Sequence, residues 1–392
     1  MANDIFLTAG RRTPIGGFQG LLSSVPAVQL GAAVVRAVLT DSKLPAERIS
    51  EVILGCVLQA GVKQGPARQA ALGGGIPSGV PTATINKLCG SGMKAIMLGY
   101  DQIRSESAAV VLAGGFESMS NAPYLLLRAR QGYRMGHDKV YDHMYLDALL
   151  SPYDDQLMGC FADATAAKYS FTREQQDAFA AESVKRAVAA SDGGAFTNEI
   201  TPVTVQDRKG TRSVTLDETP YACDIAKIPT LRPAFSKTGT VTAASSSSIS
   251  DGAAAVMLMS GSAAREYGST PLARIVAHAS HAHAPEWFTT APVAAIKSVL
   301  VKSGWRTADV DLFEINEAFA CVTMAAMHDL DIDHAKVNVN GGACALGHPV
   351  GATGTRLVTT LIHALAARGL KRGVAALCIG GGEATAIALE LV

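Results

Sequence analysis

The chain has 392 residues, of which 48% are hydrophobic and 6% aromatic. This length exceeds the size at which one hydrophobic core usually stops growing, so we expect two or more packed core units. The 34 basic and 34 acidic residues cancel, which excludes a broad charged field that would gather nucleic acid or an anionic membrane. No apolar run approaches the roughly 20 residues of a membrane span, and residues 1–10 lack a signal-type pattern. We therefore expect a soluble cytoplasmic protein with neither nucleic acid nor membrane as a partner.

Cysteine and histidine spacings argue against disulfides and bound metal. The seven cysteines are odd in number and form no C-x-x-C pair, so reduced thiols are expected. His278, His281 and His283 are close in sequence, but no cysteine or carboxylate completes a recognised ligand spacing around them. We predict no metal site.

The first part of the chain has the pattern of strands alternating with helices. Residues 52–55 and 110–118 are apolar runs typical of buried strands, and the second ends in a glycine pair followed by a glutamate. Between them, a β-prone run at 82–85 leads through a turn at 86–92 into a helix predicted at 93–104.

Cys89 lies in that turn, at the N-terminus of the predicted helix. The partial positive charge and free N–H groups at a helix N-terminus favour an anion, so we expect the thiol pKa to be lowered, as a nucleophile requires. The alternative is that Cys89 is a small buried hydrophobic residue.

The middle of the chain, at 120–250, is richer in charged and aromatic residues and shows helical periodicity near 173–190. We interpret it as an inserted loop domain that ends in a low-complexity serine loop at 245–248. Residues 251–259 then have the pattern of a strand returning to the first core.

The last third of the chain repeats the pattern of the first. A buried strand is predicted at 312–315, glycine-rich turns at 340–349 precede a helix at 353–367, and residues 376–384 parallel 110–118. Two such series argue for βαβ units and mostly parallel sheets, twice over.

This last third carries three more candidate positions. Glycine and proline around His348 are expected to fix the backbone and expose the imidazole, which could accept a thiol proton, although a loop histidine is usually an ordinary surface group. Cys378 closes a strand before Gly380, whose amide could form an oxyanion site, or the glycines could simply allow a tight strand end. Asn316 could donate a hydrogen bond or orient a water, or it could cap a helix.

Taken in order, these segments resemble the thiolase family from end to end, with matches at 11–16, 86–92, 117–120, 316–320, 347–351 and 378–382. Four reactive-site motifs in family order make the resemblance specific. It implies an α/β thiolase fold of two duplicated core domains in a five-layer αβαβα arrangement, commonly assembled as a homotetramer (a dimer of dimers). The implied domains are an N-terminal core (1–119 plus 251–268), a loop domain covering the CoA site (120–250) and a C-terminal core (269–392).

The resemblance also implies the roles of the reactive residues. Cys89 would be the acylated nucleophile, His348 its activating partner, and Cys378 the acid/base that handles the second substrate's proton. Asn316 with His348 would line one oxyanion hole, and the backbone amides of Cys89 and Gly380 would form the other. Coenzyme A and acyl-CoA would be substrates, and no cofactor would be bound permanently. Residues 337–342 resemble the biosynthetic branch, so we expect reversible Claisen condensation of two acetyl-CoA to acetoacetyl-CoA plus CoA.

The substrate-binding side departs from the family pattern. Leu157 stands where a histidine is typical, Tyr221 where relatives often carry an arginine near the CoA nucleotide, and Phe288 where methionine is common. Because tyrosine cannot supply a fixed cation to phosphate, CoA thioesters are expected to bind more weakly. The expected substrate contacts are Leu157, Met158, Tyr221, Ser247, Phe288, Ala318 and Phe319.

Other functions are compatible with parts of this pattern. A degradative 3-ketoacyl-CoA thiolase of broader chain length uses the same residues, and a thiolase-like protein could bind CoA thioesters with weakened catalysis. A cysteine hydrolase also uses Cys, His and Asn, but it would leave Cys378 without a role. A decarboxylating ketoacyl synthase normally has a second histidine or an asparagine where Cys378 stands.

Overall fold

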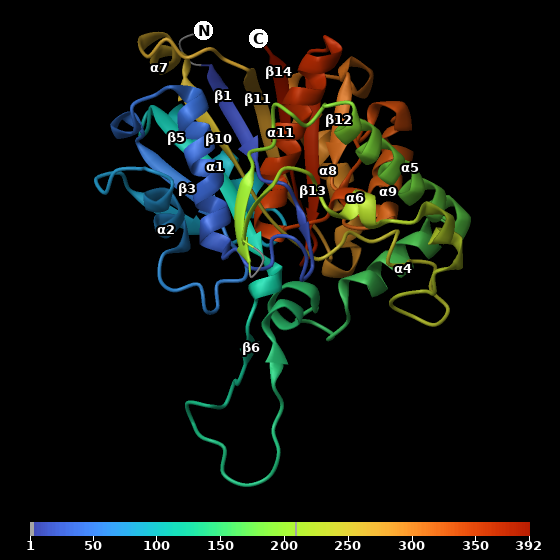
Figure 1. Ribbon diagram of the computed structural model, residues 1–392. Helices are drawn as coiled ribbons and strands as arrows, with labels where there is room; N and C mark the ends of the chain where they lie inside the picture. The colour runs from blue at the N-terminus through green and yellow to red at the C-terminus, as the bar shows by residue number, and fades with distance from the viewer. Residues whose placement is uncertain (1–3, 208–209) are drawn as a thin grey trace.

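The computed structural model describes residues 4–207 and 210–392, and a mixed ten-stranded β-sheet lies at its centre (Figure 1). The strand order is β12-β13-β14-β11-β1-β10-β5-β3-β4, and β2 pairs with β10 outside this order. The strands are β1 (Ile5–Arg12), β2 (Gly16–Gly17), β3 (Glu51–Gly55), β4 (Thr82–Ile85), β5 (Val110–Ser118), β10 (Ser250–Ser260), β11 (Ala273–Ala282), β12 (Leu312–Ile315), β13 (Arg372–Ile379) and β14 (Glu383–Leu391).

The sheet consists of two similar halves. Among the described strands, they join only where β1 pairs with β11, through two residue pairs. In one half, β3 runs parallel to β5, and antiparallel β10 and β1 follow. In the other, β12 runs parallel to β13, and antiparallel β14 and β11 follow. The duplication expected from the sequence is therefore confirmed.

The expectation of mostly parallel sheets is wrong. Among the described strands of this sheet, only the β3–β4, β3–β5 and β12–β13 pairs are parallel. The reason is the connections: β13 turns directly into β14, and β10 returns from the middle of the chain antiparallel to β5. The short turn between β13 and β14 can join only antiparallel strands, whereas the long connection between β5 and β10 leaves their relative direction open.

Five layers result from the way helices cover the two halves (Figure 1). Helices α3 (Ser91–Arg104) and α11 (Val350–Arg368) form the middle layer, and α11 contacts β5 and β10 on one side and β12 and β13 on the other. Helices α1 (Ala27–Ser42) and α2 (Pro66–Gly73) cover the outer face of the first half. Helices α8 (Ala291–Ser303) and α9 (Ala320–Leu330) cover that of the second.

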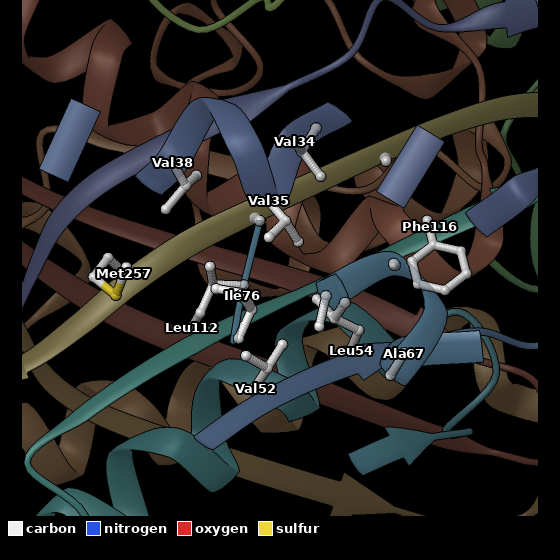
Figure 2. Close-up of a cluster of buried hydrophobic side chains, with 14 of the residues drawn as sticks. Val34, Val35, Val38, Val52, Leu54, Ala67, Ile76, Leu112, Phe116 and Met257 are labelled. Atoms are coloured by element: carbon white, nitrogen blue, oxygen red, sulfur yellow. The ribbon is translucent and has the colours of Figure 1, made fainter. Parts of the chain in front are cut away.

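The core of the first half shows why these residues form layers. Along α1, Leu30, Val34, Val35 and Val38 recur at helical spacing and are fully buried, so one face of the helix is apolar. Figure 2 shows this face packed against side chains of the sheet, including Phe116 of β5. Each such buried aliphatic side chain stabilises the fold by about 1.5–3 kcal/mol relative to exposure.

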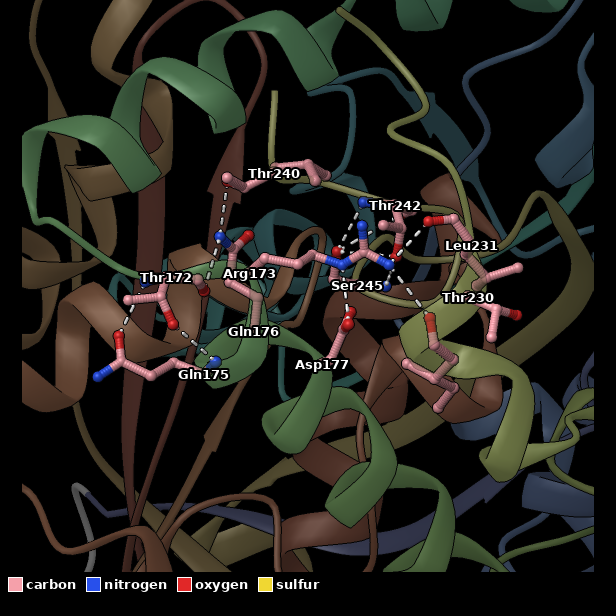
Figure 3. Close-up of polar contacts among 12 residues, drawn as sticks. Thr172, Arg173, Gln175, Gln176, Asp177, Thr230, Leu231, Thr240, Thr242 and Ser245 are labelled. Carbon is pink, nitrogen blue, oxygen red and sulfur yellow. Dashed lines mark hydrogen bonds and ion pairs between the residues drawn. The ribbon is translucent and has the colours of Figure 1, made fainter. Parts of the chain in front are cut away.

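The middle of the chain contacts the second half through α5, whose Ser183 hydroxyl donates to the Glu317 carboxylate. The structure has helices α4 (Met158–Lys168), α5 (Arg173–Asp192) and α6 (Thr219–Ala222) here, with the ribbons β6–β7 (Tyr124–Leu125, Tyr141–Asp142) and β8–β9 (Val203–Asp207, Gly210–Val214). A capping box between Thr172 and Gln175 begins α5, and Arg173 Nη2 donates to the carbonyls of Ile228 and Leu231 (Figure 3). The long β6–β7 loop extends away from the body.

Shorter elements complete the chain. They are α7 (Gly261–Glu266), α10 (Ala343–Leu346), a π-helical turn at Tyr145–Leu149, and 3-10 turns at Ala46–Arg48, Met119–Asn121, Ile225–Thr230, Pro285–Thr290, Thr307–Asp309 and His334–Lys336. Within the described ranges, no helix is both long and apolar enough to cross a membrane.

Candidate active site

The turn that carries Cys89 is fixed by its own hydrogen bonds. Leu88 adopts a positive φ of 50°, and the Ser91 hydroxyl donates to the Leu88 carbonyl at 2.7 Å while accepting from the Lys87 amide at 2.8 Å. A side chain at Gly90 would place its Cβ 2.3 Å from Cδ1 of Ile379. The Cys89 turn therefore rests directly on the end of β13, which belongs to the other half of the sheet.

The environment of the Cys89 sulfur combines burial with two amide donors. Burial raises the thiol pKa to about 11, and hydrogen bonds from the backbone N–H groups of Gly380 and of Cys89 itself oppose the rise. The expected lowering of this pKa is wrong, because desolvation outweighs the donors at the helix N-terminus. The resting nucleophile candidate is a thiol, so a base must remove its proton.

Cys378 lies at the end of β13 and is 1% exposed. Burial is the main cause that raises its pKa well above the ordinary value, and the second is the charge of Cys89. The two thiols, far apart in the sequence, therefore lie within electrostatic reach of each other.

Asn316 reaches the same place because β12 and β13 are parallel neighbours. Its backbone N–H donates to the Ala376 carbonyl at 3.0 Å, two residues before Cys378. The side chain is completely buried, and neither amide atom has a hydrogen-bond partner among the described residues. Since α9 begins at Ala320 with Phe319 as its N-cap residue, the helix-cap alternative is wrong.

His348 is buried, at 6% exposure, so the expected exposed imidazole is wrong. Its Nδ1 lies 2.7 Å from the Thr353 hydroxyl, which itself donates to the Pro349 carbonyl at 3.0 Å. Because that hydroxyl proton is already used, Nδ1 must be the donor, and Nε2 keeps a free lone pair. Burial, assisted by the charge of Arg356, lowers the imidazole pKa to about 3, so the ring is neutral.

The serine loop connects these elements. Ser247 donates its N–H to the Ala318 carbonyl at 2.9 Å, and the Ser248 carbonyl accepts the His348 N–H at 3.1 Å. Two residues beyond His348, Val350 packs in one apolar cluster with Cys89. Cys89, His348, Asn316 and Cys378 are thus carried by directly contacting segments.

The structure adds Glu117, to which sequence reasoning gave no role. This fully buried carboxylate accepts the backbone N–H groups of Val57, Leu58 and Gly351, each at 3.0 Å. Burial raises its pKa to about 7, against these hydrogen bonds. The signal available in the sequence was a glutamate inside an apolar strand, which is rarely buried without partners.

Most expected substrate contacts lie around the thiols. Phe288, Ala318 and Phe319 share an apolar cluster with Cys378, and half-buried Met158 packs against it. A Cβ at Gly380 would lie 3.7 Å from the Met158 sulfur. Leu157 precedes α4 and is half-buried, as is Ser247.

Tyr221 stands apart from this cluster. It is 48% exposed, and its hydroxyl donates to Asp192 at 2.7 Å.

The described chain contains no group of three or more side chains that could hold a metal ion. Of the three clustered histidines, His278 contacts Asp101, and His283 contacts the Trp287 carbonyl.

Comparison with known proteins matches both parts of the chain. The family model "Thiolase, N-terminal domain" matches residues 5–262, and "Thiolase, C-terminal domain" matches residues 269–391. The chain is 49% identical over 388 residues to an acetyl-CoA acetyltransferase of Pseudomonas aeruginosa, covering 98% of this chain and 99% of the relative. It is 47% identical over 392 residues to that of Escherichia coli, covering 100% and 99%.

Two solved structures are similar over their whole length. The acetyl-CoA acetyltransferase of Bacillus anthracis superposes with a TM-score of 0.97 at 40% identity, covering 99% of both chains. Human mitochondrial 3-ketoacyl-CoA thiolase gives 0.96 at 39% identity, covering 100% of both. The fold and the end-to-end sequence match agree, and the chain belongs to the thiolase family.

Proposed function

We propose that this thiolase is an acetyl-CoA C-acetyltransferase, which condenses two acetyl-CoA reversibly to acetoacetyl-CoA and CoA through an acetyl group on Cys89. Full-length relatives at 46–49% identity carry the name acetyl-CoA acetyltransferase. The observation that carries the proposal is the meeting of half-buried Cys89, whose sulfur lies beside the Gly380 amide, with buried Cys378 at the seam between the halves.

The first half-reaction begins from two thiols and a neutral imidazole. The Cys89 proton passes to Nε2 of His348, whose lone pair is free, and the thiolate attacks the carbonyl of acetyl-CoA. The bond to the CoA sulfur breaks, and the departing thiolate takes the Cys378 proton. The products are free CoA as the thiol, acetyl-Cys89, a charged His348 and the thiolate of Cys378.

The second half-reaction restores every proton. The Cys378 thiolate removes a proton from the methyl group of a second acetyl-CoA, and the carbanion attacks the acetyl-Cys89 carbonyl. The carbon–sulfur bond to Cys89 breaks, and its sulfur recovers a proton from His348. A thiol with a raised pKa suits this step, because its thiolate is a strong base.

Two oxyanion sites would hold the charge that develops on the carbonyl oxygens. The amides of Cys89 and Gly380 already point at the sulfur, so they are placed to donate to the oxygen of a thioester formed there. The buried Asn316 amide, with the protonated His348, would stabilise the enolate of the second substrate. Coenzyme A and its thioesters are substrates in this scheme, with no permanently bound cofactor.

Intact-mass measurement after mixing with acetyl-CoA tests the acyl-enzyme. One acetyl adduct is expected in the wild type and none in Cys89→Ser. Absence of an adduct would instead support a protein that only binds CoA thioesters. Rapid CoA-independent hydrolysis of the thioester would support a cysteine hydrolase.

The alternative of a degradative thiolase differs in acyl length. Phe288 and Phe319 pack around Cys378, and Phe161 and Phe235 contact them edge to face, which favours a short acyl group. Thiolysis rates measured over 3-ketoacyl-CoA chain lengths should therefore be highest for acetoacetyl-CoA. A clear preference for medium or long chains would contradict this assignment.

We also propose a cytoplasmic homotetramer of three-domain subunits, with residues 120–250 covering the CoA site. The β6–β7 loop supports self-association, because Tyr124, Leu126, Leu127, Met135 and Val140 are exposed there. Light scattering after size exclusion should give four times the chain mass.

Tyr221→Arg should lower the KM for acetyl-CoA if Tyr221 weakens CoA binding, and an unchanged KM would contradict that role.

A further inference from the structure

We propose that Glu117 is a positioning residue, which fixes the His348-bearing start of α11 against Val57 and Leu58, two residues that pack in one apolar cluster with Cys89. The inference rests on the proposed acyl transfer for the role of Cys89. Among the described residues, the Glu117 carboxylate hydrogen-bonds to three backbone amides and to the Cys56 thiol, and none of these groups reacts in the proposed scheme.

The first support is the identity of the groups that Glu117 joins. Its Oε2 accepts from the amides of Val57 and Gly351, and its Oε1 accepts from the amide of Leu58. Val57 and Leu58 follow β3 in the first half of the sheet, whereas Gly351 is the second residue of α11 from the second half. One carboxylate therefore bonds both halves at once.

The second support is the tightness of the same junction. A Cβ at Gly115 would lie 1.9 Å from the Gly351 carbonyl oxygen, and a Cβ at Gly351 would lie 2.7 Å from Oε2 of Glu117. The start of α11 has no room to shift toward β5, and the carboxylate holds it from moving away. Since His348 is three residues before Gly351, this junction sets where the imidazole stands.

The third support is electrostatic. The carboxylate lies at the N-terminus of α11, where the helix dipole favours an anion, and accepts three amide protons. Its charge is one of the causes that raise the Cys89 thiol pKa. The Cys56 thiol, whose sulfur lies 3.8 Å from Oε1, also contacts the carboxylate. Glu117 therefore favours the thiol form of Cys89 until His348 takes the proton.

Two substitutions separate position from charge. Glu117→Gln keeps the size but has a single oxygen and a donating nitrogen, so at least one amide loses its acceptor. Glu117→Asp keeps the charge but is one methylene shorter. Glu199→Gln is the matched control, because Glu199 is equally buried and pairs with Arg12.

Three measurements on the full-length protein are informative: kcat and KM for acetyl-CoA, thermal unfolding, and the pH dependence of iodoacetamide alkylation of Cys89, followed on its peptide by mass spectrometry. We expect both Glu117 variants to lose about tenfold or more in kcat with little change in KM. In Glu117→Gln the alkylation midpoint should move to lower pH, whereas in Glu117→Asp and Glu199→Gln it should stay with the wild type.

The proposal is overturned if the alkylation profile of Glu117→Gln superimposes on that of the wild type. It is also overturned if kcat of the Glu117 variants falls no further than that of Glu199→Gln at equal loss of thermal stability. The proposed acyl transfer fails separately, when the wild type forms no acetyl adduct, and the alkylation profiles still test Glu117 in that case.

Discussion

Residues 110–118 and 376–384 have the same sequence pattern, an apolar run entering glycines and then a glutamate, but the structure uses them differently. In the first, β5 continues straight through Glu117 to Ser118, and Glu117 is completely buried. In the second, β13 ends at Ile379, and the chain turns through two glycines with positive φ into β14. Glu383, the counterpart of Glu117, is half-buried and pairs with Lys87.

The glycines explain this difference. Gly114 and Gly115 in β5 allow backbone contact, since added Cβ atoms would lie 2.3 Å from the Ala254 carbonyl oxygen and 1.9 Å from that of Gly351. Gly381 and Gly382 instead supply φ values of 87° and 89°, which side chains rarely adopt. Glycine thus has two uses. In residues 110–118 it lets the two halves approach closely, and in residues 376–384 it forms the turn that directs the Gly380 amide to Cys89.

The largest expected effect comes from removing the Cys378 thiol, which residues 376–384 contain and residues 110–118 lack. Cys378→Ala should lower the condensation rate by about 10²–10⁴-fold, the usual contribution of a general acid/base. The acetyl adduct on Cys89 should still form, more slowly, because in the proposed scheme His348 and not Cys378 accepts the Cys89 proton. Steady-state rates and intact mass measure the two effects. Cys321→Ala, from the same apolar cluster, is the control, and equal losses in both variants would contradict the role of Cys378.

The next effect tests the glycine turn itself. Gly382→Ala combines a positive φ with a Cβ only 2.3 Å from the His283 carbonyl oxygen, whereas Gly381→Ala has a positive φ and no described atom within 4 Å. We expect Gly381→Ala to cost about 1–2 kcal/mol of unfolding free energy from backbone strain. Gly382→Ala should cost at least about 1 kcal/mol more through the clash. Denaturant unfolding measures both, and equal costs would show that the turn can relax.

A smaller effect is on the pH dependence of stability, to which buried His348 and buried Glu117, one from each half, contribute. His348 has a pKa of about 3 in the folded protein and an ordinary value of 6.5, so the unfolded chain binds more protons between these values. Stability should therefore fall as pH falls below 6.5, by up to about 1.4 kcal/mol per unit. His348→Asn should flatten this slope in denaturant titrations from pH 6.5 to 4.5.

Glu117 gives the opposite sign in an overlapping pH range. Its pKa rises from 4.5 to about 7 on folding, so the folded state binds more protons and this contribution to stability falls as pH increases from 4.5 to 7. Glu117→Gln should remove that fall. If the unfolding free energies of His348→Asn and Glu117→Gln changed with pH by the same slope, the two groups would not contribute with opposite signs.

The smallest effect concerns Glu383, the half-buried counterpart of the fully buried Glu117. Its side chain and that of Lys87 are 33% and 30% exposed, so the pair should contribute about 0–1 kcal/mol. Glu383→Gln should therefore unfold within that margin of the wild type, and the difference should shrink at high salt. The charge swap Lys87→Glu with Glu383→Lys should restore the unfolding free energy of the wild type. A salt-independent loss of several kcal/mol would contradict this expectation and show that Glu383, like Glu117, acts as a buried structural carboxylate.

Much of the fold could be predicted because its signals are local. Apolar runs at 52–55, 110–118 and 312–315, and the helical period at 173–190, all lie within the elements found. Strand direction could not be predicted as well, because it depends on which strands become neighbours. The antiparallel pairing of β5 with β10 joins residues more than 130 positions apart, and no local pattern specifies it.

For the site, the sequence alone determined which residue types stand in glycine-rich turns and in what order, and these carried the resemblance that pointed to Cys89, His348, Asn316 and Cys378. Only the tertiary structure decided their chemical state. The Cys89 pKa rises rather than falls, the His348 imidazole is buried and neutral, and Glu117 becomes a clamp between halves. Desolvation is the reason, since it sums over neighbours brought together from distant parts of the chain.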